Sequence, residues 1–296
     1  MHAFLGKRSD IMFGKRYDGR RIHDIEPFAT IVPYIMKTRT DSQNLFNEDF
    51  SCEPLDAYIK QKKQEGFDYN YLKIVIATMT RVIAQKPGLN RFVMNGKIYT
   101  RHKIMVSFVV QRNLRDDSAG TTVKLTFNGT ETLEEISKAI DAAVHKTTKV
   151  EAENSTDKLA KVIMSIPGPF IRLAVNTIIF LDKHNALPKA IIDASPFHTS
   201  FFITNLKSIG LNYIYHHVYE FGTTGLFIAL GKERKKVVPL SNTEMGIQKT
   251  LTLGLVSDER FCDGLYFAKA MKLFKRYMTR PELLETPLEA KVEDVR

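Results

Sequence analysis

Residues 251–264 are Leu-Thr-Leu-Gly-Leu-Val-Ser-Asp-Glu-Arg-Phe-Cys-Asp-Gly, and this stretch decides the fold. Its three leucines alternate with small or polar residues, which predicts a half-buried strand. Four polar residues, 257–260, then end the apolar run, so we expect their side chains to emerge at the strand end. Asp263-Gly264 predicts a tight turn, and apolar residues follow at helical spacing as far as Tyr277. The stretch therefore predicts a strand, a charged turn and a helix.

The same kind of pattern extends upstream and predicts a mixed α/β chain. Helices are predicted from Leu55 to Gly66 and from Leu72 to a stop at Lys86-Pro87-Gly88. Asn95-Gly96 between apolar runs predicts a hairpin, and strands are predicted at 103–111 and 123–127. Thr132 and Glu135 form a capping box that opens another helix.

Composition limits the class of protein. The chain has 296 residues, 44% of them hydrophobic, and no Pro/Gly/Ser-rich linker, so one large domain is expected. The net charge of +10 indicates an anionic partner, for which coenzyme A, nucleic acid and an anionic membrane all fit. Scattered basic residues without a nucleic-acid-binding motif argue against nucleic acid. The cluster 232–236 predicts a solvated turn or, alternatively, a contact with coenzyme phosphates.

The cysteines, histidines and N-terminus exclude several other classes. The charged N-terminus lacks the apolar core of a signal peptide, and two isolated cysteines suit a reducing compartment, so a cytoplasmic protein is expected. Cys262 is expected to be a packed residue rather than a nucleophile. No metal is predicted, because no histidines stand at metal-ligand spacing, and no phosphate-binding glycine loop is present.

Residues 258–264 resemble the motif Asp-His-Arg-x-x-Asp-Gly of the chloramphenicol acetyltransferase-like superfamily. This superfamily includes the catalytic domains of 2-oxoacid dehydrogenase acyltransferase (dihydrolipoamide acyltransferase) subunits. Six positions fit, and Glu259 stands where the family has histidine. The order of elements through Pro-Gly-Leu-Asn at 87–90 is similar as well, and so is the segment 201–210. The resemblance implies an α/β (α+β) two-layer sandwich, a mixed sheet with helices packed on it, over roughly residues 20 to 280.

The resemblance also implies roles for particular residues. The family histidine removes a proton from a hydroxyl or thiol, and Glu259 would be a weaker base, with an ordinary pKa of about 4.3 against about 6.5. Thr204 stands where the family serine stabilises the oxyanion, and Asp263 is expected to form a salt bridge with Arg20 or Arg21. Three histidines are alternatives for the missing base: His198, His216 and His217.

The implied activity is acyl transfer from a coenzyme A thioester to a hydroxyl or thiol of a small molecule or carrier. Coenzyme A would be a substrate, bound in a tunnel between the subunits of a homotrimer or a higher assembly. The alternative is a catalytically degenerate member that serves as a trimeric scaffold or an acyl-CoA-binding module. No lipoyl group is expected on this chain, because the similar region begins about 20 residues from Met1.

Three segments complete the expected organisation: an arm at 1–20, a catalytic-type domain at 21–280 and a charged, loosely held tail at 281–296. Within the domain, the apolar stretch 155–196 does not follow the family pattern. Pro167 and Pro169 interrupt it, so two helices are expected rather than a membrane span. We expect these helices to pack on the core or on a trimer neighbour, in preference to a membrane surface.

Overall fold

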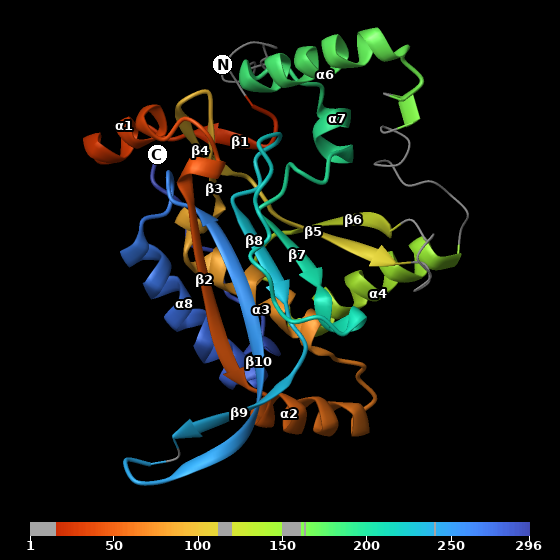
Figure 1. Cartoon of the computed structure of the whole chain (residues 1–296), viewed down its shortest axis with the longest axis vertical. Coiled ribbons are helices and arrows are strands. Elements are labelled where there is room, and N and C mark those ends of the chain that lie inside the picture. Colours follow the sequence, from red (N-terminus) through yellow and green to blue (C-terminus); the bar gives the residue numbers. More distant parts are fainter. Residues whose placement is uncertain (1–15, 112–119, 150–160, 163, 240) are drawn as a thin grey trace, which may run out of the picture.

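A mixed sheet forms the centre of the molecule (Figure 1). The computed structural model describes residues 16–111, 120–149, 161–162, 164–239 and 241–296. The strand order is β2-β10-β8-β7-β5-β6, with β9 paired to β10. β7 runs parallel to β5 and β8, and the other neighbours are antiparallel. The bounds are β2 (Gln43–Ser51), β5 (Ile104–Gln111), β6 (Gly120–Phe127), β7 (Phe201–Asn205), β8 (Leu226–Leu230), β9 (Arg234–Pro239) and β10 (Met245–Asp258).

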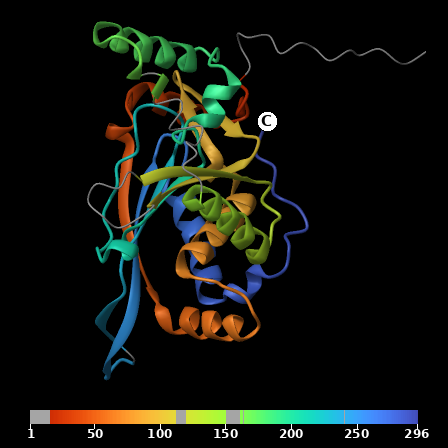
Figure 2. The ribbon, with the colours of Figure 1, turned by 90° about the vertical axis from the view of Figure 1, so that its right-hand side faces the viewer.

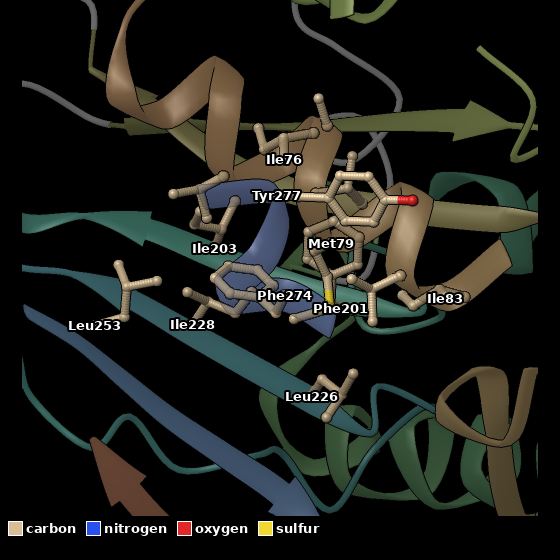
Figure 3. Packing of buried hydrophobic residues seen from close by; sticks show 14 of the residues in the cluster. Ile76, Met79, Ile83, Phe201, Ile203, Leu226, Ile228, Leu253, Phe274 and Tyr277 are labelled. Carbon is tan, nitrogen blue, oxygen red and sulfur yellow. The ribbon is translucent and has the colours of Figure 1, made fainter. Parts of the chain in front are cut away.

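Helices cover one face of this sheet, as Figure 2 shows from the side. They are α2 (Cys52–Gln64), α3 (Tyr71–Gln85), α4 (Leu133–Lys149) and α8 (Gly264–Thr279). Figure 3 shows Met79 of α3 and Phe274 of α8 packed against Ile203 and Ile228 of the strands, and all four side chains are buried. Burying such side chains contributes about 1.5 to 3 kcal/mol each. The predicted two-layer α/β sandwich is therefore confirmed.

Local signals placed several elements correctly. Asn95 and Gly96 have positive φ values of 50° and 71° and join β3 (Arg91–Met94) to β4 (Lys97–Arg101), as the hairpin signal predicted. In the capping box, the Glu135 backbone N–H donates to Thr132 Oγ1 at 3.2 Å, and the Thr132 N–H donates to the Glu135 carboxylate at 2.8 Å. The prediction of a solvated turn at 232–236 is wrong, because strand β9 begins at Arg234.

The second face of the sheet is crossed by the segment 211–218. This segment passes so close to β10 that a Cβ atom at Gly254 would lie 2.2 Å from the carbonyl oxygen of Ile214. Further along the segment, His216 stacks on Phe227 of β8, with ring centroids 4.0 Å apart. Only a residue without a side chain allows this approach, so Gly254 lets an irregular segment cover the sheet.

Both ends of the described chain are held to the core. Strand β1 (Gly19–Arg21) pairs with β4, and residues 1–15 of the predicted arm lie outside the described residues. The prediction of a loosely held C-terminal tail is wrong: Leu284 is buried, the Val292 N–H donates to the Ala84 carbonyl at 2.8 Å, and Asp294 forms an ion pair with Arg91. These contacts bind the tail to α3 and β3 along its length.

The apolar stretch forms helices at one end of the molecule. The chain breaks at Pro167 as predicted, and α6 (Gly168–Lys183) and α7 (Lys189–Ala194) follow. Of the two expected partners of the stretch, the core is wrong for α6, because Asp182 is the one side chain of this helix that is buried, and packing on a trimer neighbour stays a prediction. A further exposed helix, α1 (Pro27–Ile35), lies at the same end (Figures 1 and 2). Among the described residues, no helix has the length and apolar character of a membrane span.

Candidate functional site

The turn after β10 is built on a buried carboxylate. Asp258 is fully buried and accepts hydrogen bonds from Ser42 Oγ at 3.1 Å and from the backbone N–H of Arg260 at 3.1 Å. The Arg260 guanidinium folds back onto the same carboxylate, with Nε at 2.9 Å and Nη2 at 2.7 Å. The expectation that the side chains of 257–260 emerge at the strand end is therefore wrong for three of the four, because Ser257, Asp258 and Arg260 are buried.

A second arginine, Arg39, braces the turn from a distant part of the chain. It lies just before the short 3₁₀ helix η1 (Thr40–Ser42), and its Nη1 atom is 3.9 Å from Asp258 Oδ2. The guanidinium also donates to the carbonyls of Thr224 at 2.6 Å and Gly222 at 2.7 Å. Burial lowers the pKa of Arg39, and the Asp258 charge opposes that shift. Sequence reasoning missed this residue because no local pattern marks it.

Glu259 is held at the apex of this braced turn. Its backbone N–H donates to the Ser42 carbonyl at 2.8 Å, and its side chain is half-buried. Within the described part of the chain, its carboxylate has no hydrogen bond or ion pair to another residue. The Glu259 carboxylate is thus without a partner among the described residues, on a turn that buried ion pairs hold in place.

Thr204 lies on β7, on the sheet face opposite the helices. Its neighbours Phe201 and Ile203 enter the helix-covered core, so the alternation of a strand directs Thr204 to the second face. Its half-buried side chain has no hydrogen-bond partner among the described residues. Two unpaired groups of complementary chemistry, Thr204 and Glu259, are therefore present in the chain.

These two groups do not meet within one protomer. Thr204 pairs with Ala229 of β8, which pairs in turn with Gly254 of β10. Five residues separate 254 from 259, so Glu259 lies about 17 Å further along the sheet, at about 3.3 Å per residue. A reacting atom must lie about 3 Å from each catalytic group, so a single protomer cannot supply both. The expected convergence of the two side chains requires a second copy of the chain.

His216 is the candidate histidine that lies nearest to Thr204 along the sheet. It stacks on Phe227, and Phe227 pairs with Phe202, two residues before Thr204 on the same face. Its Nδ1 atom lies 3.0 Å from the His217 carbonyl oxygen. Burial lowers the pKa of His216, which favours the neutral imidazole that a general base requires. His217 itself is exposed.

His198 belongs to a buried charge network instead. The ring is completely buried, with Nδ1 2.8 Å from Ser195 Oγ and Nε2 3.1 Å from Asp182 Oδ2. Asp182 also accepts from Arg16 at 2.9 Å, and Arg16 pairs with Asp18 at 2.8 Å. Both ring nitrogens are thus engaged away from solvent. The network joins the end of α6 to the N-terminal segment and the chain before β7.

The expected salt bridge of Asp263 is replaced by other contacts. The Asp263 side chain caps α8 by accepting from the Tyr266 backbone N–H at 2.8 Å. Arg20 donates to the Asp294 carbonyl at 2.8 Å, and Arg21 is exposed. In the described residues, no ion pair joins Asp263 to either arginine. The buried pairing of Asp258 with Arg39 and Arg260 braces the turn in its place.

Cys262 is a buried residue rather than a nucleophile. Burial, followed by the charge of Asp263, raises the pKa of the Cys262 thiol to about 12, so the thiolate nucleophile is disfavoured. Across the residues with described positions, no group of three or more histidine, cysteine, aspartate or glutamate side chains is arranged to hold a metal ion.

A cleft of about 480 Å³ adjoins the braced turn. Tyr34 of α1 and Ile179 of α6 contribute apolar walls, and the charged lining has four cations, Lys37, Arg39, Lys183 and Arg260, and one carboxylate, Glu220. The cleft is therefore amphipathic and positively charged at the end of the molecule where Glu259 lies.

No family model and no curated protein sequence matches the chain. Solved structures do match. A probable dihydrolipoamide acetyltransferase from Listeria monocytogenes is 14% identical with a TM-score of 0.56, covering 86% of this chain and 93% of the other. A truncated catalytic core of the 2-oxoacid dehydrogenase multienzyme complex from Thermoplasma acidophilum is 12% identical with a TM-score of 0.54, covering 88% and 99%. A chloramphenicol acetyltransferase is 8% identical with a TM-score of 0.53, also covering 88% and 99%. The chain therefore has the chloramphenicol acetyltransferase-like fold of these acyltransferases.

Proposed function

We propose that this protein transfers an acyl group from a coenzyme A thioester to a hydroxyl or thiol acceptor, at a site completed by two protomers. The observation that carries the proposal is the environment of the Glu259 carboxylate. Its half-buried carboxylate has no partner among the described residues, yet the turn beneath it is fixed by the buried Asp258, Arg39 and Arg260. A rigid support for an uncommitted acid–base group is typical of catalytic sites. The fold, shared with acyltransferase catalytic cores, supports the same reaction class.

In this proposal, Thr204 of one protomer faces Glu259 of the next across a subunit interface. The separation of about 17 Å within a protomer supports this arrangement, because the two groups can act together only between copies. A cyclic homotrimer would repeat the pairing at each of its interfaces. Coenzyme A and a small-molecule or carrier acceptor would enter the shared site from different sides.

The chemistry requires one proton transfer and one acyl transfer. The Glu259 carboxylate removes the proton from the acceptor as its oxygen or sulfur attacks the thioester carbonyl. The Thr204 hydroxyl donates a hydrogen bond to the oxyanion of the tetrahedral intermediate. Collapse of the intermediate breaks the carbon–sulfur bond, and the coenzyme A thiolate takes the proton from Glu259.

A second candidate base is His216. It lies on the same face as Thr204 in the same protomer, and burial lowers its pKa so that the neutral ring dominates at pH 7. With this base, acyl transfer would need no residue from a neighbouring copy. The two candidate bases therefore differ in how many protomers supply the residues of one site, and variants can measure that number.

The test compares Glu259→Gln, Thr204→Val and His216→Asn in an assay of thioester cleavage with a thiol or hydroxyl acceptor. Losing the oxyanion donor at Thr204 should lower kcat by about 10² to 10³. If Glu259 acts across the interface, co-refolding the first two variants should restore activity at about one site in four of a randomly mixed trimer. If His216 is the base, its variant loses activity, Glu259→Gln keeps activity on its own, and mixing it with Thr204→Val adds nothing beyond the share of Glu259→Gln protomers.

The non-catalytic alternative remains testable with the same protein. Binding of acetyl-coenzyme A should raise the melting temperature, because a ligand that binds only the native state stabilises it. Coenzyme binding without turnover in wild type would favour an acyl-CoA-binding scaffold over an enzyme. Calorimetry that detects no coenzyme A binding in the millimolar range would refute the proposed acyl transfer, and a monomer in light scattering would refute the site shared between two protomers.

A further inference from the structure

Helix α6 exposes several large apolar side chains along its length. Phe170, Leu173 and Phe180 are 59%, 64% and 59% exposed, and Asp182 at the C-terminal end is the helix's buried residue. Both views of the ribbon place α6 at the end of the molecule, away from the helices that cover the sheet (Figures 1 and 2). Large exposed apolar surfaces of this kind mark sites of protein or membrane interaction.

A second exposed apolar helix lies beside it. In α1, Phe28, Ile31 and Ile35 are 67%, 51% and 66% exposed. The two helices approach each other at the cleft described above, because Tyr34 of α1 and Ile179 of α6 line the same cavity. We call the exposed faces of α1 (Pro27–Ile35) and α6 (Gly168–Lys183) together the α1–α6 platform.

The exposed charges within the platform are cations, Arg172 and Lys183 of α6. Outside the platform, the exposed Lys37 follows α1 after Met36, and the exposed Glu26 precedes it. Helix α1 contains no acidic residue, and the one carboxylate of α6, Asp182, is buried and paired with Arg16 and His198. An apolar face with cations and no exposed carboxylate is complementary to anionic headgroups over acyl chains. Two copies of the platform placed face to face, as in a twofold dimer, would instead bring like charges together, and contact with a different surface of a trimer neighbour is tested by the oligomeric mass below.

From these observations we propose that the α1–α6 platform binds the surface of an anionic lipid bilayer. Phe170, Leu173 and Phe180 enter the boundary between headgroups and acyl chains, while Arg172 and Lys183 contact phosphates. With 16 residues, α6 is about 24 Å long, and it lies along the interface rather than across the bilayer. This binding mode is independent of acyl transfer and needs no coenzyme.

The experiment is vesicle co-sedimentation of the full chain. Wild type should sediment with vesicles that contain phosphatidylglycerol, bind phosphatidylcholine vesicles less, and detach as salt is added, because salt screens the headgroup charges. Leu173→Glu and Phe180→Glu should each weaken binding roughly tenfold or more, since each removes a large apolar side chain from the interface. Ile247→Glu is the matched control: this residue is 75% exposed on the β9–β10 hairpin, at the opposite end of the molecule.

Circular dichroism of each variant establishes that its fold is retained. The proposal is overturned if wild type stays in the supernatant with anionic vesicles, or if the α6 variants bind as wild type does. It is also overturned if light scattering shows that the α6 variants lower the oligomeric mass, because the platform would then be an interface between copies. Loss of binding in the α6 variants alone, at unchanged mass, supports it whatever the outcome of the coenzyme experiments.

Discussion

Replacing Asp258 by asparagine should lower the free energy of unfolding by about 3 to 5 kcal/mol, the usual cost of removing one partner from a buried ion pair. The carboxylate is fully buried and accepts hydrogen bonds from Ser42 and three Arg260 nitrogens, with Arg39 3.9 Å away. Asparagine keeps the shape but removes the charge, so both buried guanidinium groups lose their counter-ion. The amide also turns an N–H₂ group toward an arginine donor.

Urea unfolding followed by circular dichroism measures this cost, with a matching fall in melting temperature of about 6 to 20 °C. Glu134→Gln is the control, because Glu134 pairs with Lys138 on the exposed side of α4, with 44% and 75% of the two side chains accessible. Its loss should cost less than about 1 kcal/mol. A cost within that same range for Asp258→Asn would refute the reasoning that the turn depends on a buried carboxylate.

Three further outcomes follow from the structure. Burial lowers the pKa of His198 although Asp182 opposes it, so the unfolded chain binds the proton more readily than the folded protein. The free energy of unfolding should therefore fall as the pH drops below about 6.5. In urea unfolding, His198→Asn should flatten this pH dependence. Gly254→Ala should destabilise the protein by about 1 to 3 kcal/mol in the same assay, because the new methyl group would collide with the backbone of Ile214. Glu259→His should raise thioester turnover if the carboxylate is an impaired base, and an unchanged rate in a folded, coenzyme-binding variant would contradict that view.

Elements set by neighbouring residues could be predicted from the sequence. The hairpin at Asn95-Gly96 depends on positive φ, and the capping box at Thr132 depends on bonds between residues three apart. Both signals are complete within a few positions of the chain. The local elements gave a mixed α/β chain, and the two-layer fold was implied by the resemblance to the chloramphenicol acetyltransferase-like superfamily.

The bracing of the turn could not be predicted in the same way. Asp258 and Ser42 are 216 positions apart, and neither stands in a pattern that indicates the other. The family resemblance implied Asp263 as the ion-pairing residue, whereas the structure uses Asp258. The exposure of α6 escaped prediction for a related reason: an apolar helix has the same composition whether it faces a core or an external surface.

The charge network fixes α6 at one end. Asp182 is held by Arg16 and by His198, and His198 stands three residues before β7. The C-terminal end of α6 is thus anchored in a buried ionic cluster, while Phe170 and Leu173 nearer its N-terminal end stay exposed. The helix is therefore attached to the body of the protein by charge and turned outward by apolar residues.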